Sequence, residues 1–354
     1  MFKEKYSVVG VMSGTSLDGI DLAHIVFTVV DGDWSFEMRE TKTVSYSSDW
    51  LNKLQNAVSL SELELVVLNE EYTEYLATII ISFIQSYDIN DIDAVCSHGH
   101  TVLHQPQRGI TLQIGNLPQL ATLIKQKVVC DFRVQDVVLG GQGAPLVPIG
   151  DRILFSDFDY CMNLGGFSNV SFESNGQRIA FDISPVNTVL NYFSQLLGYE
   201  YDDQGANSRL GNCNQELLTE LNKLEFYSKT FPKSLGYEFV KNVVLPLIES
   251  YDLKAHDVLR TFTEHVAFQI GKALPNEVGK MLITGGGAYN SFLLERIKFF
   301  LPKMEIVVPP AKLLEFKEAL IFGLLGILKL REEINVLSSV TGAKYNHSSG
   351  KIYE

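Results

Sequence analysis

The chain has 354 residues, of which 46% are hydrophobic, so it is long enough to bury a substantial core and is expected to form two domains. Its formal net charge of −13 argues against nucleic acid as a partner, because phosphate backbones are bound by clustered lysine and arginine. The apolar runs at 76–84 and 319–328 are too short to span a bilayer, and no secretory signal precedes the first strand. We therefore expect a cytoplasmic protein without a membrane partner.

The first predicted elements are two apolar strands, over 6–12 and 20–30, that flank the tip of the segment GVMSGTSLDGID at 10–21. Small residues at such a tip leave backbone N–H groups open to anionic oxygens, and Thr15, Ser16 and Asp18 add hydroxyl and carboxylate groups. This pattern predicts a phosphate-binding hairpin. An ordinary tight hairpin, which also favours glycine and aspartate, is the alternative.

Helices and short strands follow in the first half of the chain. A helical segment is predicted over 50–87, with Ser61 and Glu64 spaced as a capping box, followed by a buried strand at 93–97 that leads into His98-Gly99-His100-Thr101. The later elements are a strand at 111–115, a helix at 118–126, a strand at 128–130 that leads to Asp131-Phe132-Arg133, and a Gly- and Pro-rich crossing between domains at 140–148.

A second hairpin is predicted at 160–171, where Gly165 and Gly166 separate two short strands. The next strand, 178–183, carries Asp182 at its carboxyl end and faces a helix for which Ser184 is the expected N-cap, Pro185 the first residue and Gly198 the end. Ligands bind at this end of strands in α/β folds, so Asp182 is a candidate catalytic residue. A simple helix-capping role is the alternative.

The third glycine cluster follows the strand at 281–284. Gly285, Gly286 and Gly287 precede Asn290 and Ser291, which are placed to cap a helix over 292–301; further helices are predicted at 258–273 and 315–334. Neither a G-x-x-x-x-G-K-[ST] loop nor a G-x-G-x-x-G turn occurs, so the pattern favours nucleotide phosphates held by two hairpins. The four cysteines (Cys96, Cys130, Cys161 and Cys213) lack C-x-x-C spacing and are expected to be reduced core residues.

These segments together resemble the anhydro-N-acetylmuramic acid kinase family. The similar blocks, which span nearly the whole chain in order, are GVMSGTSLDGID at 10–21, SHGHTVLHQP at 97–106, TLQIGN at 111–116, DFRVQDVVLGGQGAPLVP at 131–148, NLGGFSNVS at 163–171, FPKSLGYEF at 231–239, TGGGAYN at 284–290, KEALIF at 317–322 and SVTGA at 339–343. The resemblance implies an α/β protein with two duplicated actin-like (ribonuclease H-like) lobes around an ATP cleft. We expect one lobe to comprise 1–130 with about 325–354, and the other 131–324.

The resemblance also implies an activity that uses ATP and Mg²⁺. The family opens the anhydro bridge of 1,6-anhydro-N-acetylmuramic acid with water and phosphorylates the 6-oxygen, which gives N-acetylmuramic acid 6-phosphate. The implied site residues are the base Asp182; the first phosphate hairpin with Gly14, Thr15, Ser16, Asp18 (also a Mg²⁺ ligand) and Gly19; the second with Gly165 and Gly166; the adenosine motif with Gly285, Gly286, Gly287 and Asn290; and the sugar-binding residues His100, Thr101, Asp131, Arg133, Asn187 and Glu318.

The chain departs from the family pattern at two places. FDISPVN at 181–187 stands where the family has FDTGPGN, and His100 stands where glutamine is common. The His98-x-His100-x-x-x-His104 spacing allows a metal site, but a turn near the sugar pocket is favoured, because no carboxylate completes a ligand set.

A non-catalytic sensor of nucleotide and amino sugar, and a kinase of another amino sugar, are the alternative functions. A homodimer is compatible with the sequence.

Overall fold

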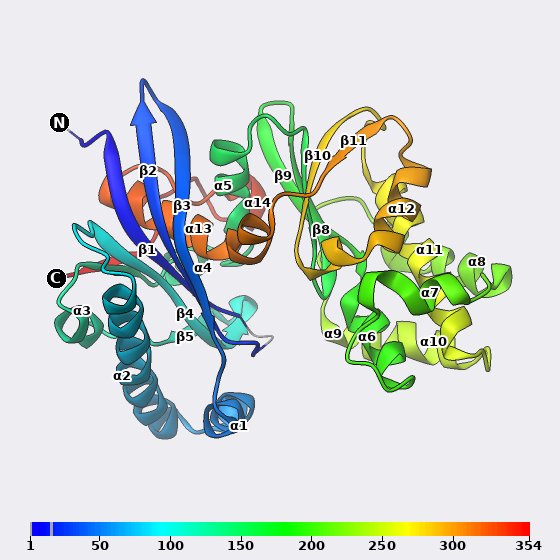
Figure 1. The fold of residues 1–354 in the computed structure, drawn as a ribbon, viewed down its shortest axis with the longest axis horizontal. Coiled ribbons are helices and arrows are strands. Elements are labelled where there is room, and N and C mark those ends of the chain that lie inside the picture. The colour runs from blue at the N-terminus through cyan, green and yellow to red at the C-terminus, as the bar shows by residue number, and fades with distance from the viewer. Residues whose placement is uncertain (1, 15–16) are drawn as a thin grey trace. The chain divides into compact units, whose positions relative to one another are not determined.

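The computed structural model describes residues 2–14 and 17–354, which form two compact units (Figure 1). The first unit comprises Met1–Leu154 and Phe316–Glu354, and the second comprises Phe155–Glu315. The sequence predicts divisions after residue 130 and near residue 325, with a crossing within 140–148. The units instead divide at 154/155 and 315/316, because α4 (Val134–Val138) and α5 (Val147–Leu154) belong to the first unit.

The sheet of the first unit has the strand order β12-β6-β4-β1-β2-β3, and β5 pairs with β4. Its strands are β1 (Lys5–Ser13), β2 (Ile20–Val30), β3 (Asp33–Val44), β4 (Ala94–Gln105), β5 (Ile110–Ile114), β6 (Val128–Cys130) and β12 (Lys351–Tyr353). β1, β2 and β3 form an antiparallel meander, whereas β4 and β6 continue the sheet in parallel with β1. The C-terminal strand β12 pairs antiparallel with β6.

The second unit repeats this topology with a sheet of order β11-β10-β7-β8-β9. Its strands are β7 (Tyr160–Leu164), β8 (Phe167–Ser174), β9 (Gln177–Pro185), β10 (Gly279–Thr284) and β11 (Met304–Val307). Again the first three strands form an antiparallel meander, and the last two run parallel to the first of them. The shared order and strand directions confirm the predicted duplication of a ribonuclease H-like lobe.

Strand alternation divides the core of the first unit between two faces of its sheet. Val9 and Val11 of β1 pack with α2 (Glu62–Ser86) and α3 (Gln119–Ile124), while α1 (Ser48–Asn56) adds Leu54 to the same cluster. On the other face, Val8 and Gly10 meet α13 (Ala311–Leu330), where an added Cβ at Gly10 would lie 2.0 Å from the Ala319 carbonyl oxygen. Gly10 is therefore required for close packing.

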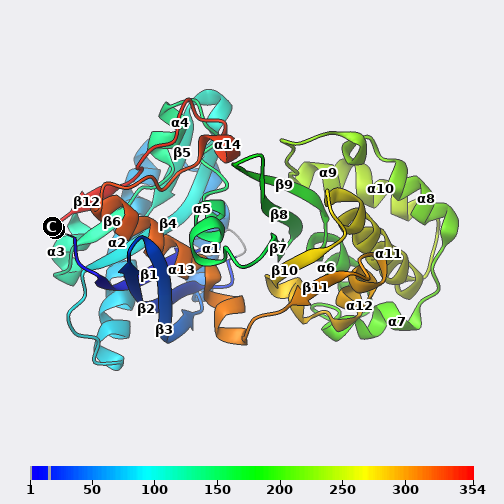
Figure 2. The same ribbon diagram turned by 90° about the horizontal axis from the view of Figure 1, so that it is seen from above.

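Helices of the second unit pack on its sheet around α11 (Ala255–Ala273), which contributes Phe262, Val266 and Ile270 to the core. The other α-helices of the second unit are α6 (Asn187–Gln195), α7 (Ala206–Leu210), α8 (Gln215–Lys223), α9 (Tyr237–Phe239), α10 (Leu245–Glu249) and α12 (Ser291–Phe300) (Figure 2). The C-terminal part of the first unit contains α14 (Ser338–Thr341), which precedes β12. Cys96, Cys130 and Cys161 are buried, as predicted, whereas Cys213 is partly exposed and does not belong to the core. Within residues 2–14 and 17–354, no helix has the length and apolarity needed to cross a membrane.

Candidate functional site

The first glycine hairpin forms as predicted, with Ser13 of β1 paired to Ile20 of β2. In the loop between them, Leu17 has a φ of 64° and donates its N–H to the Gly14 carbonyl at 3.3 Å. Gly19 has a φ of 152°, and a Cβ there would lie 2.6 Å from the Val44 carbonyl oxygen. Asp18 is exposed. Thr15 and Ser16 lie outside the described residues, so their phosphate-binding role stays a prediction.

A buried polar network fixes the strand end immediately before this loop. The Ser13 hydroxyl lies 2.6 Å from the Tyr46 hydroxyl and 2.9 Å from His100 Nδ1, and it accepts a hydrogen bond from the Tyr72 hydroxyl at 3.1 Å. Burial lowers the pKa of His100 to about 4, so its ring is neutral at pH 7. Because Gly14 follows Ser13 directly, this network anchors one side of the hairpin tip.

The predicted turn at His98-Gly99-His100-Thr101 is wrong, because β4 runs on to Gln105 and pairs with β5 from His100 to Gln105. The three histidines also have separate partners: His98 Nδ1 contacts the Gly99 carbonyl, His100 contacts Ser13, and His104 Nδ1 contacts the Thr111 hydroxyl. In the described part of the chain, no group of three or more His, Cys, Asp or Glu side chains could hold a metal ion. Thr101 accepts a hydrogen bond from the Gln113 side-chain amide at 3.3 Å.

Arg133 lies in the first unit, at the start of α4. Its Nε donates to His98 Nε2 at 2.8 Å and its Nη1 donates to the Gly143 carbonyl at 2.6 Å. Burial and the guanidinium keep the pKa of His98 well below its usual value, which suits a neutral ring that accepts this bond. Burial lowers the pKa of Arg133 itself to about 10, against the opposing effect of Glu318 and Asp136, so the guanidinium is charged at pH 7.

Two carboxylates near Arg133 differ in their availability. Glu318, on α13, is solvent-accessible, yet the surrounding protein raises its pKa, an effect that Arg133 opposes and Asp21 strengthens. Asp131 adopts a left-handed conformation with a φ of 61°, and Lys351 of β12 lies 2.7 Å from its carboxylate. Glu318 is thus available to a ligand, whereas Asp131 already has a cationic partner.

The second hairpin is a tighter turn that is joined to α6 through backbone groups. The Gly166 carbonyl accepts N–H groups of Val186 and Thr188, and the Gly165 carbonyl accepts that of Asn187. The predicted cap by Ser184 with Pro185 in the first turn is wrong, because β9 continues to Pro185 and Ser184 N–H and carbonyl both bond the buried hydroxyl of Ser168. The glycine carbonyls of the hairpin therefore hold the start of this helix.

The triple glycine packs against that same hairpin. Gly285 has a φ of 85°, and a Cβ there would lie 2.6 Å from Asn163 Oδ1 and 2.8 Å from the Leu164 carbonyl oxygen. At Gly286 the nearest atom is Asn187 Nδ2, at 3.8 Å. Asn290 caps α12 as predicted, since its side chain accepts the Leu293 N–H at 2.9 Å. Gly287 is crowded as well, since a Cβ there would lie 2.9 Å from the Leu164 carbonyl oxygen. Gly285 and Gly287 are therefore sterically required, whereas Gly286 faces open space.

A cavity of about 580 Å³ opens beside this glycine segment, entirely within the second unit. It is lined by Asn187, Leu190, Asn191, Tyr201, Asp202, Asp203, Gln204, Gly286, Gly287, Tyr289 and Asn290. Its volume lies in the range of small-molecule sites, and its amides, carboxylates and tyrosines can bond and stack on a nucleoside. Asn187, for which the family resemblance implies sugar binding, also lines this cavity, and its sugar-binding role stays a prediction.

Asp182 lies near the carboxyl end of β9, opposite Asn169 of β8. Its Oδ2 accepts the Leu235 N–H at 2.8 Å, and its own N–H bonds the Lys233 carbonyl at 3.1 Å. Burial raises the pKa of Asp182, and the Leu235 hydrogen bond opposes that rise. A carboxylate in this setting is a stronger base than an exposed aspartate and is suited to removing a proton.

With this geometry established, the comparisons with known proteins identify the family. The chain matches the family Anhydro-N-acetylmuramic acid kinase over residues 6–354. The chain belongs to the anhydro-N-acetylmuramic acid kinase family. It is 34% identical to the anhydro-N-acetylmuramic acid kinase of Pseudomonas syringae pv. syringae (strain B728a), with 98% of each chain covered, and 31% identical to that of Vibrio cholerae serotype O1 (strain ATCC 39315 / El Tor Inaba N16961), with 99% of each covered.

Among solved structures, (R)-2-hydroxyglutaryl-CoA dehydratase component A of Acidaminococcus fermentans aligns with 92% of this chain and 99% of its own, at 14% identity and a TM-score of 0.45. That likeness is too distant to support the fold assignment, which rests on the repeated strand order of the two units.

For this member of the kinase family, the structure groups the predicted residues into two sets. In the first unit it joins Ser13, at the base of the first hairpin loop, to His100, and it brings Arg133 within electrostatic reach of Glu318. In the second unit it joins Gly165 and Gly166 to Asn187, beside the triple glycine and Asn290. The sequence missed the Tyr46 and Tyr72 hydroxyls, which no motif marks, and it missed Tyr289 although that residue follows the triple glycine almost directly.

Proposed function

We propose that this chain catalyses the ATP-dependent conversion of 1,6-anhydro-N-acetylmuramic acid and water to N-acetylmuramic acid 6-phosphate and ADP. Family membership over residues 6–354 supports the kinase activity and the sugar. The observation that carries the hydrolytic step is the half-buried Asp182 carboxylate with its raised pKa. A phosphoryl transfer to an existing hydroxyl would not need a base that acts on water at the anomeric carbon.

In the proposed reaction, Asp182 takes a proton from water as the water oxygen attacks C1 of the sugar. The C1–O6 bond breaks, and its electrons remain on O6, which attacks the γ-phosphorus of ATP while ADP leaves. Leu235 N–H fixes one carboxylate oxygen through its 2.8 Å bond, so that the other oxygen can face the water. The raised pKa increases the affinity of the carboxylate for this proton.

Side chains of the first unit are proposed to bind the sugar. Arg133 carries a charged, planar guanidinium that suits the lactyl carboxylate. Glu318 is accessible and can accept hydrogen bonds from sugar hydroxyl groups, and His100 and Thr101 remain candidate sugar contacts. Asp131 is better assigned to the loop itself, because Lys351 occupies its carboxylate.

ATP is proposed to place its nucleoside in the cavity beside Gly286 and Asn187 and its phosphates against the glycine hairpins. Mg²⁺ in nucleotide sites takes few protein carboxylates and completes its shell with phosphate oxygens and water. The exposed Asp18, at the tip of the first hairpin, fits this requirement as the protein ligand. The ion would offset the negative charge of the phosphates during transfer. Because ATP is the donor, we place the reaction in the cytoplasm.

Incubation with ATP, Mg²⁺ and the anhydro-sugar in ¹⁸O-labelled water tests the proposal. The expected product is a 6-phosphate with ¹⁸O at C1, detected by mass spectrometry at short times. Unlabelled N-acetylmuramic acid 6-phosphate, incubated in the same water, corrects for spontaneous exchange at C1. A phosphorylated product without the label would identify a plain amino-sugar kinase, and binding of both ligands without turnover would identify a sensor.

A further inference from the structure

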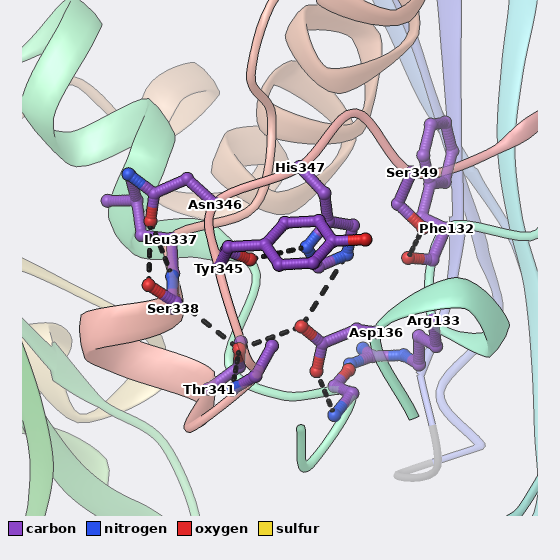
Figure 3. A network of polar contacts seen from close by, with 12 residues as sticks. Phe132, Arg133, Asp136, Leu337, Ser338, Thr341, Tyr345, Asn346, His347 and Ser349 are labelled. Carbon is purple, nitrogen blue, oxygen red and sulfur yellow. Dashed lines mark hydrogen bonds and ion pairs between the residues drawn. The ribbon is translucent and has the colours of Figure 1, made fainter. Parts of the chain in front are cut away.

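The loop that carries Arg133 is held on both sides by the C-terminal segment of the chain, which the sequence marks only with the short block SVTGA (Figure 3). Before Arg133, the Ser349 hydroxyl donates to the Phe132 carbonyl at 2.6 Å. After it, the Thr341 hydroxyl donates to Asp136 Oδ1 at 2.7 Å. Residues more than two hundred positions apart in sequence therefore fix the backbone on each side of one arginine.

Asp136 connects Thr341 to the guanidinium of Arg133. Its side chain is fully buried, and its Oδ2 accepts the Gly143 N–H at 2.7 Å. The carbonyl of Gly143 in turn accepts Arg133 Nη1 at 2.6 Å. Hydrogen bonds thus link Thr341 to Asp136, Asp136 to the N–H of Gly143, and the carbonyl of Gly143 to the guanidinium of Arg133.

The loop is closely fitted around this carboxylate. A Cβ at Gly141 would lie 2.2 Å from Asp136 Oδ2, and His347 Nε2 lies 3.6 Å from Oδ1. The Gln142 N–H donates to the Thr341 carbonyl at 2.8 Å, so backbone and side chain of Thr341 both contact the loop. The negative charge of Asp136 also helps Arg133 to remain protonated in its buried position. Loss of one partner would therefore move or loosen the guanidinium.

We propose that Thr341 and Asp136 are positioning residues that set the Arg133 guanidinium for a carboxylate on the substrate, so that the C-terminal segment controls the preference for an acidic sugar. This inference rests on the proposed function, in which Arg133 binds the lactyl carboxylate. A bidentate contact between guanidinium and carboxylate depends strongly on orientation, so a small displacement reduces affinity for the acidic sugar and leaves a neutral sugar unaffected.

The test measures binding of 1,6-anhydro-N-acetylmuramic acid and of 1,6-anhydro-N-acetylglucosamine, which lacks the lactyl group, by calorimetry on the full chain. Thr341→Val removes the hydroxyl at nearly constant volume and should weaken binding of the acidic sugar about tenfold, because the guanidinium loses part of its fixed orientation. Binding of the neutral sugar and of an ATP analogue should change less than about twofold. Thr341→Ser, which keeps the hydroxyl, should restore the preference.

Thr73→Val is the matched control, because Thr73 is also fully buried in the first unit but donates its hydroxyl to the Asn69 carbonyl within α2. It should lower thermal stability without changing the ratio of the two sugar affinities. If Thr341→Val does not fold, Ser349→Ala, which frees the Phe132 carbonyl, gives an independent measurement with the same expected direction. Equal losses for both sugars, or no loss, would overturn the positioning role.

Arg133→Gln separates this inference from the function on which it rests. If Arg133→Gln abolishes the preference for the acidic sugar and Thr341→Val leaves it intact, the positioning role is wrong and the proposed carboxylate contact stands. If Arg133→Gln retains the full preference, the carboxylate contact itself is wrong, and the inference fails with it. Loss of the preference in both variants, with rescue by Thr341→Ser, supports both.

Discussion

The two glycine hairpins occupy equivalent places in sheets of the same strand order, yet they are anchored in different ways. The first has a longer loop between Ser13 and Ile20, and side chains hold its base: Ser13 contacts Tyr46 and His100. In the second, Leu164 and Phe167 leave only Gly165 and Gly166 between the strands, and their carbonyls bond the first residues of α6. One hairpin depends on a buried side-chain network and the other on backbone hydrogen bonds.

This difference shows how one duplicated lobe can serve two tasks. In the first unit, buried side chains anchor the base of the loop, and the exposed Asp18 can face an ion and phosphates. A tip whose carbonyls start a helix, as in the second unit, fixes the position of Asn187 and of the triple glycine that packs on Leu164. Under the proposed function, the first hairpin would present a carboxylate to the ion and phosphates, and the second would position the residues that line the nucleoside cavity.

The largest expected effect is a loss of turnover when Asp182, in the second unit, is replaced. Asp182→Asn keeps the shape and one acceptor but cannot take a proton, so turnover should fall at least about a hundredfold while ATP and sugar bind with near-native affinity. Steady-state rates and calorimetry measure the two quantities. Asp159→Asn is the control. Asp159 also accepts a backbone N–H, from Lys280 at 2.7 Å. It directly precedes β7, whereas Asp182 lies near the carboxyl end of β9. Turnover of Asp182→Asn within a few-fold of wild type would exclude this base.

The triple glycine offers a pair of substitutions with different readouts. Gly285→Ala combines a positive φ with a clash against the Leu164 backbone and should lower the free energy of unfolding by about 2–4 kcal/mol. Gly286→Ala has space and should leave stability nearly unchanged, but its methyl group lies at the cavity and should raise the KM for ATP several-fold. Urea unfolding and kinetics measure both. A wild-type KM for ATP in Gly286→Ala would argue against a nucleoside in this cavity.

Serine substitutions test the contrast between the hairpins directly. Ser13→Ala removes the common partner of Tyr46, Tyr72 and His100 and should cost about 1–3 kcal/mol of stability, with a raised KM for ATP because the phosphate loop starts at the next residue. Ser168→Ala removes a buried hydroxyl that, within residues 2–14 and 17–354, bonds Ser184 of the neighbouring strand alone. It should cost similar stability with an unchanged KM. Equal KM values in both variants would mean that the Ser13 network does not position the loop.

The sequence predicted the hairpins, the three glycine clusters and the strand-end position of Asp182, because each depends on local patterns of apolar strands and small residues. It failed where distant partners decide the structure. His98-Gly99-His100-Thr101 looks like a turn, yet β4 continues through it, with Gly99 at a φ of 74° and pairing to β5 from His100 onward. Ser184 and Pro185 look like a helix start, but hydrogen bonds between Ser184 and Ser168 retain them in β9. The hydrogen bonds that link Thr341 through Asp136 and Gly143 to Arg133 have no local sequence signature.

The smallest expected effect is a shift in the pH dependence of activity, which tests one carboxylate of each unit, Asp182 and Glu318. The pKa values of Asp182 and Glu318 are both raised, because the surrounding protein partly desolvates each carboxylate, so either could produce an acid limb in the pH profile of kcat/KM. A general base acts only when ionised, so a raised pKa moves that limb to higher pH than an ordinary aspartate, near 4, would give, and activity falls as the pH drops through it. We expect the limb to remain in Glu318→Gln, where the sugar KM rises, and to be absent from the residual activity of Asp182→Asn. The opposite pattern would assign the base to the first unit, and Asp182 would then serve only to orient the water.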